Sequence, residues 1–294
     1  MKKQSLSGRT CIAILLLIPI FFFILDGIIA SLNPMVNTYY FNKNDFEKNR
    51  TLHPEKVYDK VFFGNSVLIS SYKEKASRSG FIEFGLAYGK ITDLKAMLDE
   101  KLIQVDSELV IALNYFVFMD TLDTNPNYIW HKKPYEPYLY FTRNRMKTMV
   151  TDAFEDVMSL NFKFKKYPDL TKEICYGMMT DEELNERIQV HSDLYWGLSL
   201  DSFQDNFDAL KWIVDYCEAN EIKLRAVWMP WNPYHEMPEI SHNVMESANA
   251  IFDINGIEVL NLTENFSREC FYDMGHLNYE RGANEFTKEI DLWL

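Results

Sequence analysis

The feature that most constrains the fold of this chain is an alternation between short apolar runs and longer amphipathic segments. A continuous apolar run of this length indicates a strand buried on both faces, whereas apolar residues repeating every three or four positions indicate a helix with one buried face. The predicted strands cover residues 57–63, 80–86, 108–113, 223–229 and 257–262, and the predicted helices cover residues 92–102, 203–220, 244–252 and 280–293. We therefore expect an α/β fold with a mostly parallel, doubly wound, five-stranded sheet.

Residues 119–200 interrupt this alternation. The segment is rich in aromatic residues, and we expect it to be a largely helical insertion between the third strand and the helix at 203–220. Within it, residues 131–166 carry eight basic and four acidic residues, although the whole chain has a formal net charge of −13. This basic segment is either a solvated helix face or a surface for anionic lipid, an anionic polymer or a partner protein. The acidity of the whole chain argues against nucleic-acid binding.

The N-terminal residues have the pattern of a membrane anchor. Basic residues at positions 2, 3 and 9 precede an uncharged apolar run over residues 11–25, and residues 10–32 are long enough to cross a bilayer. The positive-inside rule then places the N-terminus in the cytoplasm and the rest of the chain outside it. We expect residues 1–32 to form a cytoplasmic tip and single-pass anchor, residues 33–54 a linker, and residues 55–294 the folded domain. A cleaved signal peptide is the alternative, although no small-x-small cleavage site is evident near Ala30.

Two polar motifs stand where chemistry is expected in an open parallel sheet, beyond the carboxyl ends of the strands. Ser66, in Gly64-Asn65-Ser66, directly follows the first predicted strand, and Asp273 and His276 precede the last predicted helix. Taken separately, these residues are typical of a helix N-cap and of a loop histidine. Taken together, they predict a catalytic triad, because an Asp can orient one imidazole nitrogen while the other faces a serine hydroxyl.

This combination of motifs resembles the SGNH/GDSL hydrolase superfamily, from about Val57 to the C-terminus excepting the insertion. The resemblance implies a flavodoxin-like strand order of 2-1-3-4-5, with Ser66 as nucleophile, His276 as general base and Asp273 as the carboxylate behind it. It also implies an oxyanion hole formed by the amides of Ser66 and Gly85 and by the side chain of Asn114. It implies no metal and no cofactor.

The sequence departs from the family pattern in each of the first three blocks. Asn65 stands where the family usually has Asp, and Glu83-Phe84 precedes Gly85 where an Asn is usual. The third block has Asn114 between Leu and Tyr in place of Gly-x-Asn-Asp. Together with the anchor and the insertion, these departures resemble a membrane-anchored branch that includes the D-alanyl-lipoteichoic acid protein DltD and the alginate O-acetylation proteins.

That branch implies acyl transfer to a bacterial cell-envelope polymer, either a polysaccharide or a teichoic-acid-like acceptor, beside a polytopic membrane O-acyltransferase. The same triad also fits a plain esterase or deacylase. A third interpretation is a non-catalytic envelope-assembly scaffold that keeps only the fold. In each case the domain is expected to be extracytoplasmic and tethered to the cell membrane.

Overall fold

The computed structural model describes residues 8–32, 43–126, 128–131 and 175–294, with short pieces of 151–159. The chain forms two compact units, one of Met1–Asn44 with His131–Leu170 and one of Asp45–Trp130 with Thr171–Leu294. Most of the predicted cytoplasmic tip, the first part of the linker, most of the basic segment and much of the insertion lie outside the described residues. The second unit carries the sheet and the site.

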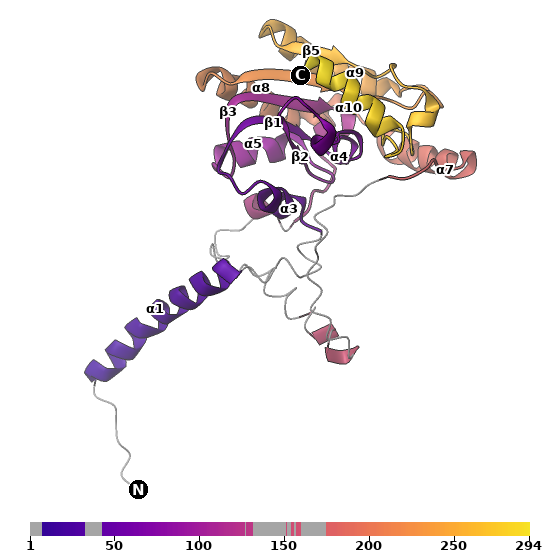
Figure 1. Ribbon diagram of the computed structural model, residues 1–294. Helices are drawn as coiled ribbons and strands as arrows, with labels where there is room; N and C mark the ends of the chain where they lie inside the picture. The colour runs from indigo at the N-terminus through magenta and orange to yellow at the C-terminus, as the bar shows by residue number, and fades with distance from the viewer. Residues whose placement is uncertain are drawn as a thin grey trace. The chain divides into compact units, whose positions relative to one another are not determined.

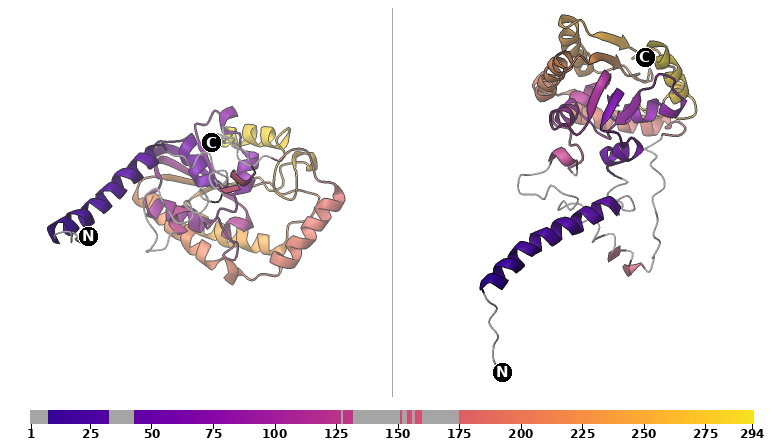
Figure 2. Two further views of the ribbon diagram at one scale, coloured as in Figure 1. Left: turned by 90° about the horizontal axis from the view of Figure 1, so that it is seen from below. Right: turned by 60° about the vertical axis from the view of Figure 1, so that its left-hand side comes forward.

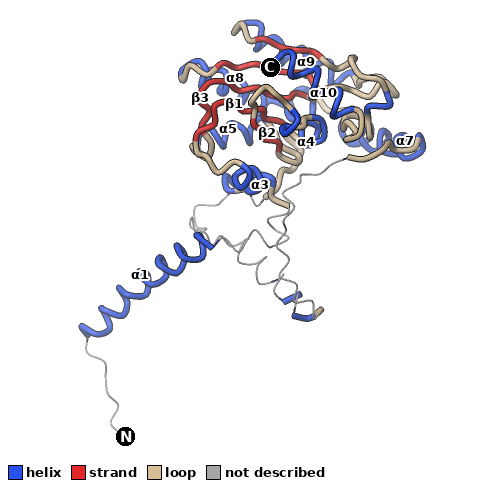
Figure 3. The backbone as a smooth tube through the Cα atoms, viewed as in Figure 1, coloured by secondary structure: helices blue, strands red, loops and turns tan. Residues whose placement is uncertain are grey.

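The second unit is built on a five-stranded sheet in which all the strands are parallel (Figures 1 and 3). The strand order is β2-β1-β3-β4-β5. The strands are β1 (Val57–Gly64), β2 (Ile82–Gly85), β3 (Gln104–Leu113), β4 (Lys223–Trp228) and β5 (Glu258–Asn261). The predicted parallel, five-stranded α/β sheet is thereby confirmed, and the strand order is the one that the family resemblance implied.

The inner strands β1, β3 and β4 each contain a buried apolar run because helices cover both faces of the sheet. Successive side chains of a strand point to opposite faces; accordingly Val61 and Phe63 pack into one buried cluster and Phe62 into another. One face is covered by α5 (Ile91–Asp99), α8 (Gln204–Ala219) and α9 (Glu239–Ile254), and the other by α4 (Ser66–Ser71) and α10 (Gly282–Trp293), as Figure 2 shows from two sides. The carboxyl ends of β1, β3 and β4 therefore share one edge between the two helical layers.

Residues 45–52 were expected to be part of a polar linker, but they form the helix α3 (Asp45–Leu52). Polar contacts attach this helix to the loop after β2. The Asp45 carboxylate accepts a hydrogen bond from the Ala87 amide at 2.9 Å, and the Asn49 side chain donates to the Gly85 carbonyl at 3.0 Å. The polar sequence of this segment did not indicate a packed helix. Its buried polar side chains are tolerated because they form hydrogen bonds with the domain.

The remaining elements are short, apart from α1 and α7. Helix α9 begins five residues earlier than predicted, after Pro238, which provides its N-cap position. The described elements outside the sheet and its covering helices are α1 (Gly8–Leu32), η2 (Glu74–Ala76), η3 (Tyr115–Phe118), η4 (Ile129–His131), α7 (Asp181–His191), the π-helical η5 (Ser192–Trp196), η6 (Leu200–Phe203) and η7 (Arg268–Cys270). In the part of the chain that the structure describes, no helix has both the length and the apolar character needed to span a bilayer.

Gly64 closes β1 directly before the turn that carries Ser66, and the packing around it leaves no room for a side chain. A Cβ atom at this position would lie 2.7 Å from the Leu68 Cβ and 2.8 Å from the Ala112 Cβ. Neither of those atoms can move without its backbone. Gly64 therefore lets α4 lie close against β3.

We predict that Gly64→Ala lowers the free energy of unfolding by about 1–3 kcal/mol, because the added methyl group overpacks the junction of β1 and α4. Urea denaturation followed by circular dichroism measures the change. Gly197→Ala is the matched control, since a Cβ there meets nothing within 4 Å and its backbone φ is −87°. Equal stability of the two variants would contradict the prediction.

Candidate active site

Ser66 is placed by the turn from β1 into α4. The N-cap of that helix is Asn65, whose side-chain oxygen accepts a hydrogen bond from the Val67 amide at 3.0 Å. Ser66 is the first residue of the helix, so its amide has no intrahelical acceptor. The hydroxyl and the amide of Ser66 are thereby presented at the carboxyl edge of the sheet.

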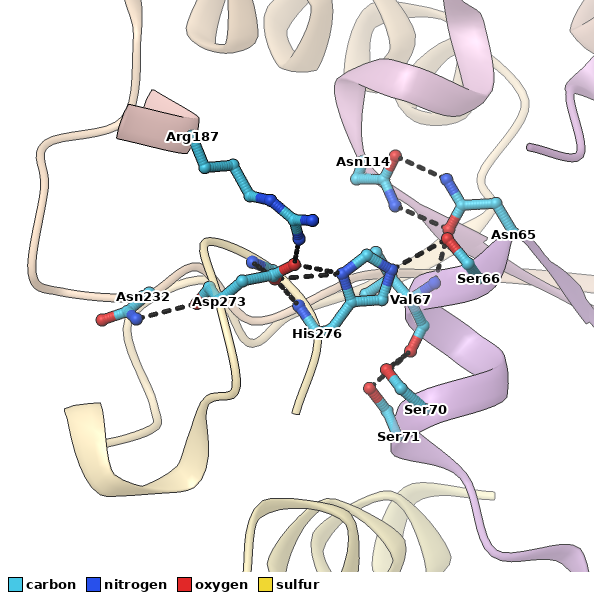
Figure 4. A network of polar contacts seen from close by, with 11 residues as sticks. Asn65, Ser66, Val67, Ser70, Ser71, Asn114, Arg187, Asn232, Asp273 and His276 are labelled. Carbon is cyan, nitrogen blue, oxygen red and sulfur yellow. Dashed lines mark hydrogen bonds and ion pairs between the residues drawn. The ribbon is translucent and has the colours of Figure 1, made fainter. Parts of the chain in front are cut away.

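The structure aligns Ser66, His276 and Asp273 in hydrogen-bonding reach of one another (Figure 4). The Ser66 Oγ lies 2.9 Å from the His276 Nε2, and the His276 Nδ1 lies 2.9 Å from Asp273 Oδ2 and 3.0 Å from Oδ1. This is the geometry that a serine nucleophile, a general base and an orienting carboxylate require. The three residues predicted to form the triad therefore meet at one point.

Asp273 also folds the loop that carries His276. Its Oδ1 accepts hydrogen bonds from the amides of Gly275 at 3.1 Å and His276 at 2.9 Å. Asn232, in the loop after β4, donates from its side chain to the Asp273 carbonyl at 2.8 Å and from its amide to the Met274 carbonyl at 2.9 Å. The histidine loop is thus fixed both from within and from β4.

The environment of Asp273 favours its ionised form. Burial by itself would raise the pKa of this carboxyl, whose side chain is 4% exposed. Two effects oppose burial: the nearby His276 charge, and the hydrogen bonds from the His276 ring and the two loop amides. Together they outweigh burial and hold the pKa of Asp273 well below its usual range. Asp273 is therefore a carboxylate at neutral pH, as its role behind the imidazole requires.

Asn114 and Asn65 form a reciprocal pair of side-chain amides between the ends of β3 and β1. Each amide nitrogen donates to the other residue's oxygen at 3.1 Å. The Asn114 oxygen also accepts from the amides of Phe116 and Val117, so the orientation of the side chain is fixed. The second N–H of the Asn114 side chain is left for a ligand. An ionised Asp at position 65 could accept from Asn114 but could not donate to it, so the reciprocal pair requires an amide at this position.

Gly85 does not supply the oxyanion donor that the family resemblance implied. Its amide donates to the Glu83 Oε1 at 2.7 Å, within the same strand end. A Cβ on Gly85 would lie 2.4 Å from that same oxygen, which shows how closely the Glu83 side chain covers the glycine. Glu83 is the residue by which the second block departs from the family pattern, and its carboxylate takes the hydrogen bond that an oxyanion would need. The oxyanion donors that remain from the prediction are the Ser66 amide and the Asn114 side chain.

The triad opens into a cavity of about 370 Å³ at the carboxyl edge of the sheet. Its lining joins the polar groups Ser66, Asn114 and His276 to apolar and aromatic side chains such as Phe116, Met237 and Met245. A few convergent polar groups in a mostly apolar pocket are typical of a small-molecule or substrate site.

Two residues of this cavity were not anticipated from the sequence. Arg187, on α7, donates a hydrogen bond to Asp273 Oδ2 and also lines the cavity. His191 lies one turn further along the same helix and lines the cavity as well. Both lie in the last part of the predicted insertion, where no motif relates them to the triad. Among the described residues, no group of three or more His, Cys, Asp or Glu side chains is arranged to hold a metal ion.

No protein-family model matches the chain, and no curated protein sequence matches it. Solved structures do resemble it at low sequence identity. A Bacteroides fragilis protein described as an acylhydrolase is 12% identical, with 84% of this chain and 91% of that chain covered and a TM-score of 0.40. A GDSL-like lipase from Bacteroides thetaiotaomicron is 12% identical, with coverages of 84% and 94% and a TM-score of 0.37. An acetyl xylan esterase is 14% identical, with coverages of 80% and 98% and a TM-score of 0.32.

The low pKa of Asp273 predicts a pH dependence of stability. Because the folded state holds the pKa below its unfolded value of about 3.9, the carboxylate stabilises the fold above that pH, and the contribution is lost as the pH falls toward the folded pKa. Between pH 6 and pH 3, the wild type should lose about 1 kcal/mol more unfolding free energy than Asp273→Asn. Urea denaturation across this range measures both slopes. Parallel slopes would contradict the assignment of a stabilising carboxylate.

Proposed function

We propose that this protein is a serine-dependent acyl-transfer enzyme that acts on esters through Ser66. The observation that carries the proposal is the continuous hydrogen-bonded line from the Ser66 hydroxyl through both nitrogens of His276 to Asp273. A hydroxyl, an imidazole and a buried carboxylate in this order are sufficient for nucleophilic acyl transfer. The adjoining cavity gives the substrate access to the hydroxyl.

In the first half-reaction, the Ser66 Oγ attacks the carbonyl carbon of the ester while the His276 Nε2 takes the hydroxyl proton. Asp273 holds the other imidazole nitrogen and stabilises the imidazolium that forms. The negative charge that develops on the carbonyl oxygen is stabilised by the Ser66 amide and the free N–H of Asn114. Each such donor contributes about 3 kcal/mol to transition-state stabilisation. The carbonyl then re-forms, the bond to the leaving alcohol breaks, and His276 returns the proton to that alcohol.

In the second half-reaction, a hydroxyl group attacks the acyl-Ser66 ester with His276 again acting as base. If the attacking group belongs to water, the product is a free acid; if it belongs to a glycan or polyol, the acyl group is transferred. We propose that transfer to a bacterial cell-envelope polymer, either a polysaccharide or a teichoic-acid-like chain, is the physiological reaction. The support for this finer assignment is the resemblance of the sequence to the envelope-acylating branch.

We further propose that the chain is a single-pass membrane protein with its N-terminus in the cytoplasm and its catalytic domain outside. The support is the uncharged apolar run over residues 11–25 behind a basic flank. In the structure, apolar side chains of α1 are left exposed, with Leu15 and Phe21 each at 67%, so they need a covering of lipid or protein. A polytopic membrane O-acyltransferase is the proposed partner, since it would deliver acyl groups to the outer surface.

Ser66→Ala should abolish turnover of 4-nitrophenyl acetate by the full-length protein, because no other hydroxyl is bonded to His276 in the described residues. We expect kcat to fall by about 10⁴ or more. Ser70→Ala is the matched control: this buried serine lies on the same helix, but its hydroxyl donates to the Val67 carbonyl, away from His276 (Figure 4). Turnover by Ser66→Ala at the wild-type rate would remove Ser66 from the nucleophilic role.

Transfer and hydrolysis are separated by the fate of the acyl group. We expect a glycan or glycerol-phosphate oligomer, added with an acyl donor, to be recovered in acylated form by mass spectrometry, with less free acid than in its absence. The Ser66→Ala variant should form no acylated oligomer. Release of free acid at the same rate with and without the acceptor would identify a hydrolase instead of a transferase.

A further inference from the structure

Arg187 is held beside the triad by the packing of α7 against the histidine loop. Leu184 and Ile188 of α7 are buried against Met274, which lies in the loop between Asp273 and His276. The start of α7 is fixed by a reciprocal capping box between Thr180 and Glu183. Arg187 follows Leu184 by three residues and precedes Ile188, so the buried face of the helix directs it to the rim of the site.

The Arg187 guanidinium uses only part of its hydrogen-bonding capacity. A guanidinium carries five N–H donors in a planar fork. One of its terminal nitrogens donates to Asp273 Oδ2, and among the described residues no other hydrogen bond to the group is formed. The side chain is 41% exposed. In Figure 4 only one terminal nitrogen of the guanidinium is joined to Asp273, and no bond is drawn to the second.

Asp273 already has hydrogen-bond donors other than Arg187. Its Oδ1 accepts from two loop amides, and both its oxygens contact the His276 ring. During acyl transfer His276 becomes an imidazolium and pairs with this carboxylate. Arg187 is then a cation without a full counter-charge, within the cavity where the ester is bound.

The charge of the cavity differs from that of the protein around it. The protein has a formal net charge of −13, yet Arg187 is the one Lys or Arg among the described residues that line the cavity. The one acidic residue in the same lining is Asp273, which is committed to His276. A lone cation in a partly apolar cavity attracts an anionic group more strongly than a cation on the open surface does.

His191 adds a neutral polar group to the same wall. It follows Arg187 by one helical turn, and its ring lies against the rings of Phe116 and Tyr195 at 5.3 and 5.5 Å between centroids. Its Nδ1 is buried and, within the described residues, has no hydrogen-bond partner. Burial, reinforced by the Arg187 charge, lowers the pKa of His191, so the ring adds no positive charge to this wall at pH 7.

We propose that Arg187, supported by His191, forms an anion-binding subsite next to Ser66, and that the substrates are esters carrying a carboxylate or phosphate group near the scissile bond. The guanidinium would hold Asp273 through one edge and the substrate anion through the other, which its planar fork allows. This inference rests on the proposed role of Ser66. It narrows the substrate class from esters in general to anionic esters.

The test compares matched ester pairs on the full-length protein. Mono-4-nitrophenyl adipate carries a carboxylate on the acyl side, and methyl 4-nitrophenyl adipate is its neutral counterpart. The anion 4-acetoxybenzoate and its neutral methyl ester place the charge on the alcohol side instead. For at least one pair, the ratio of kcat/KM for the anionic ester to that for the neutral ester should fall by about tenfold or more in Arg187→Gln, mainly through KM. Arg187→Lys should retain part of the preference.

Lys211→Gln is the control, because it removes the same charge from an exposed position on α8, away from the cavity. It should leave both ratios unchanged. If Arg187→Gln slows the neutral and anionic esters equally, Arg187 only supports Asp273 and the subsite is refuted. Unchanged ratios in both pairs refute it as well. If the wild type turns over none of the four esters, the proposed function itself fails, an outcome distinct from a loss of anion preference.

Discussion

The site depends on one hydrogen bond, the 2.9 Å contact between the Ser66 Oγ and the His276 Nε2, which joins residues 210 positions apart in the chain. Neither residue is held in this position by a long helix or strand of its own. Ser66 begins a helix of six residues, and His276 lies in a loop. The contact exists because the parallel sheet brings the end of β1 to the same edge as the segment that precedes α10. A fold that turned either end away would leave a serine N-cap and an isolated loop histidine.

Polar contacts around this bond restrict both of its ends. On the serine side, the reciprocal amide pair of Asn65 and Asn114 ties the end of β1 to the end of β3. On the histidine side, Asp273 binds the amides of its own loop, while Asn232 attaches that loop to β4. These bonds hold the Ser66 hydroxyl, the His276 ring and the Asn114 side chain in place beside the ends of β1, β3 and β4. Preorganisation of this kind is what electrostatic catalysis requires, because the groups need not reorient as charge develops.

The sequence predicted those parts of the structure that depend on local apolar patterning. The strands were identified from short apolar runs, such as residues 109–113 of β3, all of which are buried. The triad was identified because its members fall directly after β1 and shortly before α10. The structure differs where polar residues find buried partners: α3 was read as linker because Asp45 and Asn49 are polar, yet both bond to the loop after β2.

Polar contacts that the sequence does not reveal also explain which site residues were predicted wrongly and which were missed. Gly85 was assigned to the oxyanion hole by motif, but the neighbouring Glu83 side chain occupies its amide, a contact that no spacing rule reveals. Arg187 carried no signal, because it reaches Asp273 from a helix within the predicted insertion, 86 residues away in the chain. Side-chain contacts between distant segments depend on tertiary geometry, whereas burial of a strand is visible in the strand itself.

The central claim is that Ser66 is a nucleophile activated by His276, and covalent labelling tests it most directly. The full-length protein would be treated with a fluorophosphonate, and the modified residue would be identified by tandem mass spectrometry of its peptides. We predict a single label on Ser66 in the wild type, with labelling slowed by orders of magnitude in His276→Ala, since the hydroxyl then has no base. Absence of label on Ser66 in the folded wild type, or labelling that does not depend on His276, would contradict the claim.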